Sequence, residues 1–97
     1  MGYTLCFRKE DEVSASVEYA YGYNMYRYVF DPTAHKGKSG SEMAVIFHRS
    51  IEILHAKHPI RFSSRDLLKI SSGNLEILLN TLLETANKHT DWTFSVE

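Results

Sequence analysis

The chain has 97 residues, and its 11 basic and 12 acidic side chains give a formal net charge of −1. This length fits one domain, and the near-neutral charge argues against a strongly basic nucleic-acid-binding or membrane-surface protein. A single cysteine, Cys6, excludes an intramolecular disulfide. The first residues lack the pattern of a signal peptide, and no apolar run approaches the roughly 20 residues of a membrane span. We therefore expect a cytoplasmic protein that does not enter a membrane.

Two alternating stretches near the N-terminus predict a pair of strands. Apolar and polar side chains alternate with period two over residues 3–8, as in a half-buried strand. Residues 13–21 alternate in the same way, so one apolar face would run along their whole length. The charged residues 9–12 between them are short enough for a hairpin turn.

Residues 25–30 are open to two interpretations. As a strand, this stretch would place Tyr26, Tyr28 and Phe30 on one face. As a helical turn, it would begin at Asn24, a residue whose side chain caps helices well, and it would stop at the proline that follows. We favour the helical turn.

Residues 41–57 predict the longest helix. Ser39 and Glu42 have capping-box spacing, in which each side chain accepts a hydrogen bond from the other residue's backbone N–H. Pro59 disfavours the α conformation in the residue before it and ends the helix. The loop before the helix, residues 31–40, holds a proline, glycines and lysines, so we expect it to be exposed. At about 100° per residue a mainly apolar arc forms from Met43, Ile46, Phe47, Ser50, Ile53 and Leu54.

Two further helices and a last strand are predicted in the second half. Residues 64–71 form a short helix that Gly73 would end in a left-handed cap. A second helix follows at 74–88, capped by Asn74, and its apolar side chains repeat at helical spacing: Leu75, Leu78, Leu79, Leu82, Leu83 and Ala86. The final stretch, residues 91–96, alternates as a strand does.

Together these elements predict an α+β fold in a single domain, residues 1–97. A small antiparallel sheet of about three strands (3–8, 13–21, 91–96) would carry helices (41–57, 64–71, 74–88) packed on one face.

His48, Glu52 and His55 would share one face of the helix at 41–57. Imidazole and carboxylate groups at such spacing can bind zinc, but a structural zinc site takes about four ligands. A solvated polar face is therefore the simpler interpretation, and the three residues are only a weak metal-site hypothesis. The sequence shows no catalytic residues and no cofactor motif, so we expect a protein that is not an enzyme and needs no cofactor.

The run of tyrosines is the most unusual feature of the composition. Tyr21, Tyr23 and Tyr26, with Arg27, combine rigid contact area with polar tips, as residues at protein interfaces do. Some of these rings are also needed to fill the core of so small a domain. We predict that part of the run binds a larger protein.

Two lysines, Lys36 and Lys38, precede the helix at 41–57. With free N–H groups at the helix start they could hold an anion, although a solvated loop explains them equally. Together with Arg27 and the tyrosines, they provide an alternative function in nucleic-acid binding.

The layout of the chain resembles that of small uncharacterised accessory proteins of phages and mobile elements. The likeness is carried by the stretch Tyr-Ala-Tyr-Gly-Tyr-Asn at 19–24, the glycine-containing loop and helix start at 37–42, and the leucine-rich helix and final strand at 75–96. The resemblance implies a setting in the host cytoplasm. In that setting, an expected function is stoichiometric binding and inhibition of a host defence complex, as anti-CRISPR proteins do.

Overall fold

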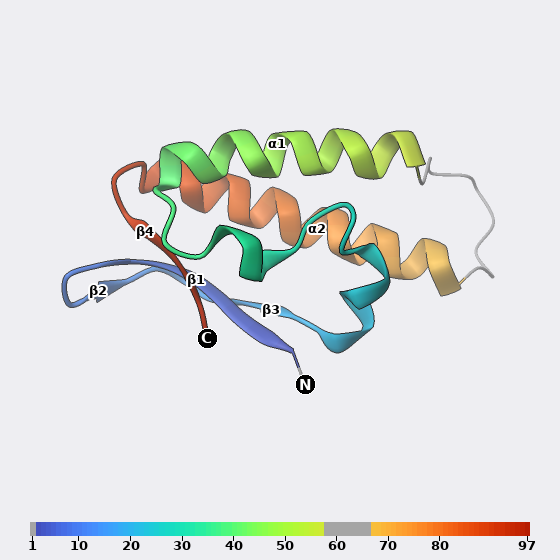
Figure 1. Ribbon diagram of the computed structural model, residues 1–97, viewed down its shortest axis with the longest axis horizontal. Helices are drawn as coiled ribbons and strands as arrows, with labels where there is room; N and C mark the ends of the chain where they lie inside the picture. The colour runs from blue at the N-terminus through green and yellow to red at the C-terminus, as the bar shows by residue number, and fades with distance from the viewer. Residues whose placement is uncertain (1, 58–66) are drawn as a thin grey trace.

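The fold has two layers, a small antiparallel sheet and two long helices that cover one face of it (Figure 1). The computed structural model describes residues 2–57 and 67–97. Its helices are α1 (Gly40–Lys57) and α2 (Leu67–Lys88), and two short 3-10 helices, η1 (Tyr21–Tyr26) and η2 (Pro32–His35), precede them. The predicted small α+β fold is confirmed.

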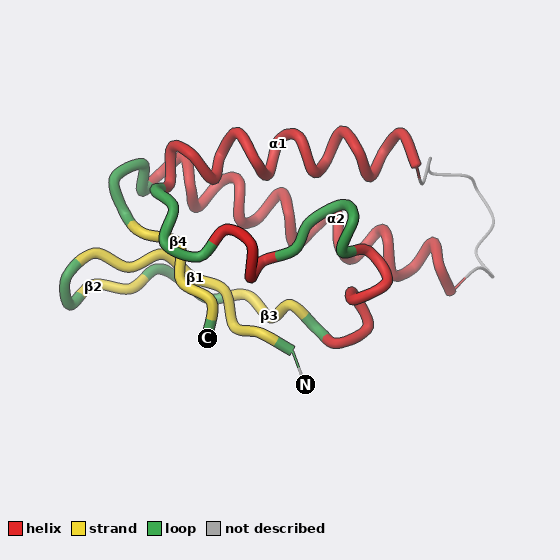
Figure 2. Tube along the Cα trace, viewed as in Figure 1, coloured by secondary structure: helices red, strands yellow, loops and turns green. Residues whose placement is uncertain are grey.

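The sheet is built around β1 (Tyr3–Lys9), its central strand. On one side β1 pairs with β2 (Glu12–Val13) and β3 (Val17–Tyr19), and on the other with β4 (Thr93–Val96), all antiparallel. Figure 2 shows this sheet below the two helices, with η1 at the end of β3. The strands predicted at 3–8 and 91–96 are therefore present.

The strand predicted at 13–21 is wrong as a single element, because a bulge divides it into β2 and β3. Arg8 faces Val13 and Leu5 faces Val17, so three steps along β1 match four along the second strand. Ser14 fills the irregular position: its N–H donates to Phe7 O at 2.9 Å, and its Oγ accepts from Phe7 N at 2.8 Å. In a regular strand Val13 and Val17 would lie on the same face of the sheet. The extra residue shifts the side chains that follow it to the opposite face, so Val13 is exposed whereas Val17 packs against the core.

The helix predicted at 41–57 is confirmed with its cap. Glu42 N donates to Ser39 Oγ, and Ser39 N donates to Glu42 Oε1, both at 3.3 Å. Gly40 N and Ser41 N donate to the carbonyls of Trp92 and Thr90 at 2.8 and 2.9 Å. The backbone N–H groups that open α1 are thus all hydrogen-bonded within the protein.

The two helices predicted at 64–71 and 74–88 are wrong as separate elements, because α2 runs without a break through Gly73 and Asn74. A glycine inside a helix costs only about 1 kcal/mol relative to alanine. Residues 64–66 of the prediction lie outside the described residues.

The segment at 25–30 is helical rather than extended, as favoured, but its start was misplaced. The 3-10 helix η1 begins four residues earlier than expected, at Tyr21, and the chain keeps winding after it, with Val29 N donating to Tyr26 O at 2.8 Å. Asn24 lies inside η1 and is not its cap. The capping position belongs to Ala20, whose side chain makes no cap hydrogen bond.

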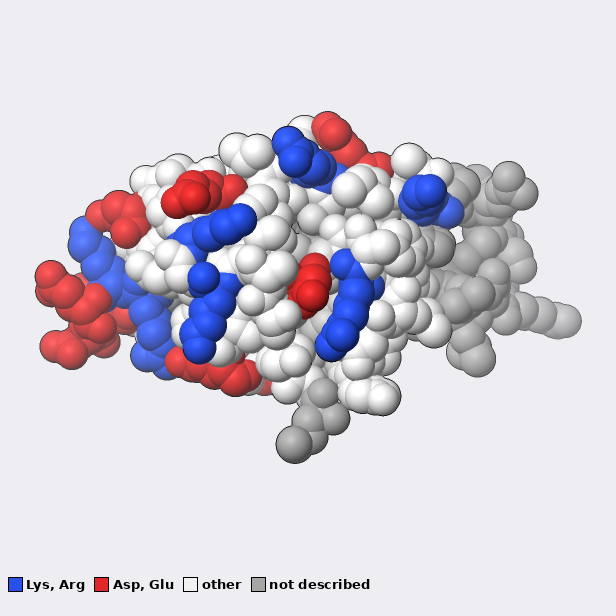
Figure 3. Space-filling view, in the orientation of Figure 1, with Lys and Arg blue, Asp and Glu red and all other residues white. Residues whose placement is uncertain are grey.

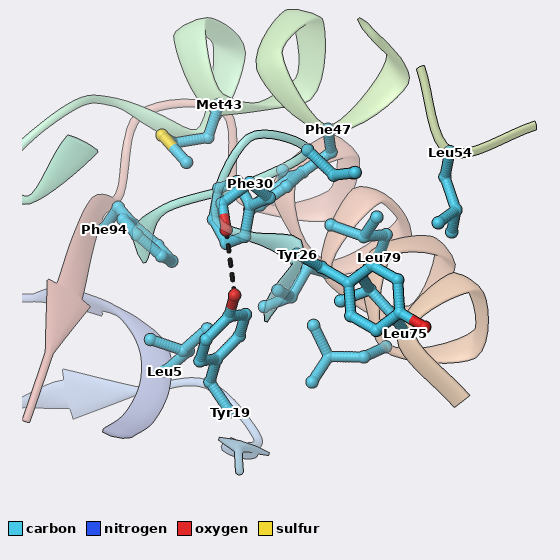
Figure 4. Close-up of a cluster of buried hydrophobic side chains, with 14 of the residues drawn as sticks. Leu5, Tyr19, Tyr26, Phe30, Met43, Phe47, Leu54, Leu75, Leu79 and Phe94 are labelled. Atoms are coloured by element: carbon cyan, nitrogen blue, oxygen red, sulfur yellow. Dashed lines mark hydrogen bonds between the residues drawn. The ribbon is translucent and has the colours of Figure 1, made fainter. Parts of the chain in front are cut away.

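The core lies between the sheet and the helices and is rich in aromatic rings (Figure 4). Phe7 and Phe94 from the sheet meet Phe47 from α1 at centroid distances of 6.4 and 5.9 Å. Phe30 packs 5.3 Å from Phe47. The largest fully buried side chains are Tyr19, Tyr26, Phe7, Phe30, Phe47, Phe94, Leu5, Met43, Leu54, Leu75, Leu79 and Leu82.

Candidate protein-binding surface

The geometry of η1 decides which tyrosines face outward. A 3-10 helix has three residues per turn, so side chains three apart lie directly above one another. Tyr23 and Tyr26 form the inward row: Tyr23 is half-buried, and Tyr26 is 1% exposed, with its ring among the core side chains (Figure 4). The prediction that Tyr26 contacts a partner is therefore wrong, because its ring fills space beside α2.

The other two rows of this turn face solvent. Tyr21 and Arg27 stand on one row, and Met25 and Tyr28 on the next. Tyr21, Met25 and Tyr28 are 68%, 56% and 54% exposed, and Arg27 is also exposed. These four residues are called the tyrosine patch below. Met25 and Tyr28 were not among the predicted contact residues, and the three-residue repeat of a 3-10 helix is the signal that would have found them.

Tyr19 fixes the turn that carries the tyrosine patch. Its hydroxyl lies 2.9 Å from the Phe30 carbonyl, the contact drawn in Figure 4. It also lies 3.1 Å from the Tyr23 carbonyl, so it joins η1 to the residue that ends the segment. Its ring packs 5.3 Å from Tyr23 and 6.2 Å from Phe30. Burial, with a smaller contribution from the Asp31 carboxylate, raises the pKa of Tyr19 to about 12, so the phenol stays protonated as the donor.

The two predicted anion-binding lysines lie elsewhere in the fold. Gly37 N donates to Phe94 O at 2.9 Å and Phe94 N to Lys38 O at 2.7 Å, so this segment runs along the outer edge of β4. Lys38 Nζ donates to His35 Nδ1 at 3.2 Å, and Lys36 is exposed. The backbone N–H groups at the start of α1 already donate to acceptors within the protein. The anion-site hypothesis requires these groups to be unpaired, so the structure does not support it.

The nucleic-acid alternative requires Arg27, Lys36 and Lys38 to act together with the tyrosines. However, η1 follows β3, whereas the lysines accompany β4 on the opposite side of β1. Figure 3 shows basic and acidic side chains interspersed over the face that it displays. The described cations therefore do not form one continuous basic track on this face.

The three residues of the metal-site hypothesis are engaged in pairs. His48 Nδ1 lies 3.2 Å from Glu52 Oε1 on α1, and His55 Nε2 lies 2.7 Å from Glu76 Oε1 on α2. Among the described residues, no group of three or more His, Cys, Asp or Glu side chains is arranged to hold a metal ion. The partner Glu76 could not be anticipated, because only the tertiary packing of α2 against α1 brings it to His55.

A shallow groove of about 380 Å³ lies between the outer sides of α1 and α2. Its lining is formed by Ala44, Val45, His48, Leu83 and Asn87. It is open to solvent and lacks a cluster of polar groups that would orient a small ligand.

No known protein family matches the chain, and no curated protein and no solved structure is similar to it. Within the described residues, neither helix combines the length and the apolar composition that crossing a bilayer requires.

Proposed function

We propose that the protein acts by stoichiometric binding to a larger protein, and that the tyrosine patch is its contact surface. The observation that carries the proposal is the exposure of Tyr21, Met25 and Tyr28 on one short turn. Tyrosine and arginine are enriched among the residues that dominate binding energy at interfaces, and methionine is enriched at interfaces generally.

The rigidity of the turn adds support. A loop that must be ordered on binding loses affinity to conformational entropy, whereas a pre-formed surface avoids that cost. Here the inward residues of the same turn belong to the core cluster or pack against it, and the Tyr19 hydroxyl holds two of its carbonyls. The backbone that carries the tyrosine patch is therefore held in place before a partner arrives.

The biological setting is also part of the proposal. In a phage or mobile element, a protein of this kind would act in the host cytoplasm as an inhibitor of a defence complex. Support comes from the resemblance in layout described above and from a small fold with an exposed aromatic surface. It would work without catalysis, without a cofactor and without a membrane.

The test compares alanine variants on and off the tyrosine patch. Tyr21→Ala and Met25→Ala should weaken binding to a partner isolated from the native host by at least about tenfold each, because both truncate exposed side chains of the tyrosine patch. Val45→Ala and Ile77→Ala are the matched controls, since both residues are exposed apolar side chains on the helices. Affinity is measured by surface plasmon resonance on purified components.

Two outcomes would overturn the proposal. In the first, Tyr21→Ala and Met25→Ala bind the partner as tightly as the wild type. In the second, Val45→Ala and Ile77→Ala lose as much affinity as the two patch variants. Circular dichroism on each variant checks that the fold is intact. A plaque assay of phage carrying the same variants then tests whether loss of binding and loss of anti-defence activity coincide.

A further inference from the structure

The outer edge of β3 presents backbone groups that no described strand uses. Thr4 N donates to Glu97 O and Glu97 N to Thr4 O, both at 2.9 Å, so Thr4 directs its backbone groups toward the β4 side. Glu18 faces Thr4 across the β1–β3 pair. In an antiparallel ladder, such a non-hydrogen-bonded position directs its N–H and C=O away from the neighbouring strand. Glu18 therefore points both groups out of the sheet.

The two edges of the sheet are treated differently. On β4, the outward groups of Phe94 are paired with Gly37 and Lys38, and Ser39 bridges to Thr93. Along β3, no described segment supplies a backbone partner to Glu18 on the outer side. Ser16 and Ala20, two residues before and after Glu18, are exposed as well. The Ala20 carbonyl already accepts from Tyr23 N at 2.9 Å, so the unused pair of backbone groups is that of Glu18. An open edge of this kind accepts an extended chain through its main-chain hydrogen bonds.

We propose that β3 receives an extended segment of the partner protein as an additional strand, and that this segment continues onto the tyrosine patch. The inference rests on the proposed function and names the form of its partner. Ala20 is extended and leads directly into η1, so a strand paired with Glu18 runs toward Tyr21 (Figure 1). Backbone pairing then fixes the direction of the segment, and the aromatic side chains supply the contact area.

The side chain of Glu18 selects the chemistry of the segment. If two copies of this chain paired antiparallel about Glu18, two carboxylates would stand directly opposite each other, which is unfavourable. A lysine or arginine in that position is favourable instead. Glu18 already accepts a hydrogen bond from Thr4 Oγ1 at 2.9 Å, which orients the carboxylate on the solvent face of the sheet. The occupant is thus a basic, strand-forming segment with an apolar residue that reaches Tyr21.

The probe is a phage-displayed library of random dodecapeptides, panned against the immobilised full chain. The decisive variant is Glu18→Pro, because proline removes one outward N–H and is tolerated on an edge strand where that N–H has no partner in the fold. The control is Glu18→Ala, which keeps the N–H and removes only the carboxylate. Selected peptides should lose at least tenfold in affinity for Glu18→Pro and about fivefold at most for Glu18→Ala.

Amide hydrogen exchange tests the same bond in the unaltered chain. On addition of a selected peptide, exchange at Glu18 N–H should slow at least tenfold, whereas exchange at Val13 on β2 should not change. Because it uses the unaltered chain, this measurement gives a result even if the Glu18→Pro variant does not fold.

The outcomes separate the two proposals. Peptides that lose affinity for Tyr21→Ala but bind Glu18→Pro like the wild type, without slowing exchange at Glu18, would overturn strand addition and leave the tyrosine patch as the contact surface. Peptides that bind Tyr21→Ala and Glu18→Pro as tightly as the wild type would overturn both proposals. A library that yields no binding peptide would overturn strand addition.

Discussion

Tyr19 is the residue through which the sheet controls the tyrosine patch. It is the last residue of β3, it lies in the core, and its hydroxyl faces two carbonyls of the segment that follows. A phenol has one proton, so one hydroxyl serves two acceptors by sharing or alternation. The single oxygen atom therefore contributes both to the stability of the domain and to the order of its proposed contact surface.

Tyr19→Phe should keep the packed ring and remove that oxygen. The buried Phe30 carbonyl would lose its donor, and we expect the free energy of unfolding to fall by about 1–2 kcal/mol. Urea denaturation measures the change. The control is Tyr21→Phe, which removes a hydroxyl from an exposed ring and should change stability by about 0.5 kcal/mol at most. Equal losses in the two variants would contradict the role assigned to Tyr19.

His35 makes the loop along β4 sensitive to acid. Its ring stacks on Phe30 at 5.7 Å, and its Nδ1 accepts from Lys38 Nζ, an arrangement that requires a neutral imidazole. Burial first, and then Lys38, lower the pKa of His35 below 6.5, against an opposing effect of Asp31. The unfolded chain then binds the proton more readily. The stability contributed by His35 is therefore complete above pH 6.5 and is lost as the pH falls through its folded-state pKa.

Lys38→Met should raise the pKa of His35 toward its ordinary value, because it removes one of the two causes of the depression. An NMR titration of the imidazole carbon-bound protons measures it directly. Lys36→Met is the matched control, since it removes a neighbouring exposed lysine and should leave the titration unchanged. A His35 pKa that does not respond to Lys38→Met would contradict the contact between the two side chains.

At the scale of elements, the start of α1 is joined to the turn between α2 and β4. Gly40 lies so close to this turn that a Cβ added there would stand 2.1 Å from His89 O. The same approach allows the hydrogen bonds from Gly40 and Ser41 to the carbonyls of Trp92 and Thr90. Only glycine permits this contact, which connects the beginning of one helix to the end of the other.

Gly40→Ala should therefore destabilise the domain by about 2–3 kcal/mol, because backbone atoms must move apart to admit the methyl group. Thermal and urea unfolding measure the loss. Gly22→Ala is the control, since nothing lies within 4 Å of its added Cβ, and it should change stability by about 0.5 kcal/mol at most. A Gly40→Ala protein as stable as the wild type would show that this contact is looser than described.

Elements were predictable from the sequence where a local pattern determines them. The capping box of Ser39 and Glu42 and the leucine repeat of α2 depend only on residues a few positions apart, so helix formation could be predicted there. The bulge at Ser14 could not be predicted, because its side chain replaces a backbone acceptor and leaves the apparent alternation intact. The predicted break within α2 is wrong because a glycine does not by itself end a helix: inside one it costs only about 1 kcal/mol relative to alanine.

The candidate site was less predictable than the fold. Tyrosine composition pointed to the segment that carries the tyrosine patch, but it could not separate Tyr21, which is exposed, from Tyr26, which lies in the core. That distinction depends on whether the segment is a strand, in which every second side chain shares a face, or a 3-10 helix, in which every third one does. The sequence is compatible with both. Closeness along the chain suggests that the lysines act with Arg27, whereas the sheet order separates them.

At the scale of the whole molecule, one aromatic cluster joins the two layers. Phe47 of α1 contacts Phe7, Phe30 and Phe94, so it connects the helix to β1, to β4 and to the segment after η1. A domain of 97 residues has a small core, and typical domains are stable by only about 5–15 kcal/mol.

Phe47→Ala should lower the free energy of unfolding by about 3–5 kcal/mol, because it leaves a cavity where four rings meet. Val45→Ala, two residues earlier on the exposed side of the same helix, should cost about 0.5 kcal/mol at most. Chemical denaturation measures both. Similar costs at the two positions would contradict the division of α1 into a core side and a solvent side.

The place of β4 beside β1 has a consequence during synthesis on the ribosome. Residues 3–9 leave the exit tunnel early and can pair at once with β2 and β3, but their other side has no neighbour until residues 93–96 emerge. While the residues between β3 and β4 are being synthesised, the second side of β1 is thus a bare edge, which favours pairing with other chains. Ribosomes stalled before this last strand should therefore carry nascent chains that aggregate or recruit chaperones.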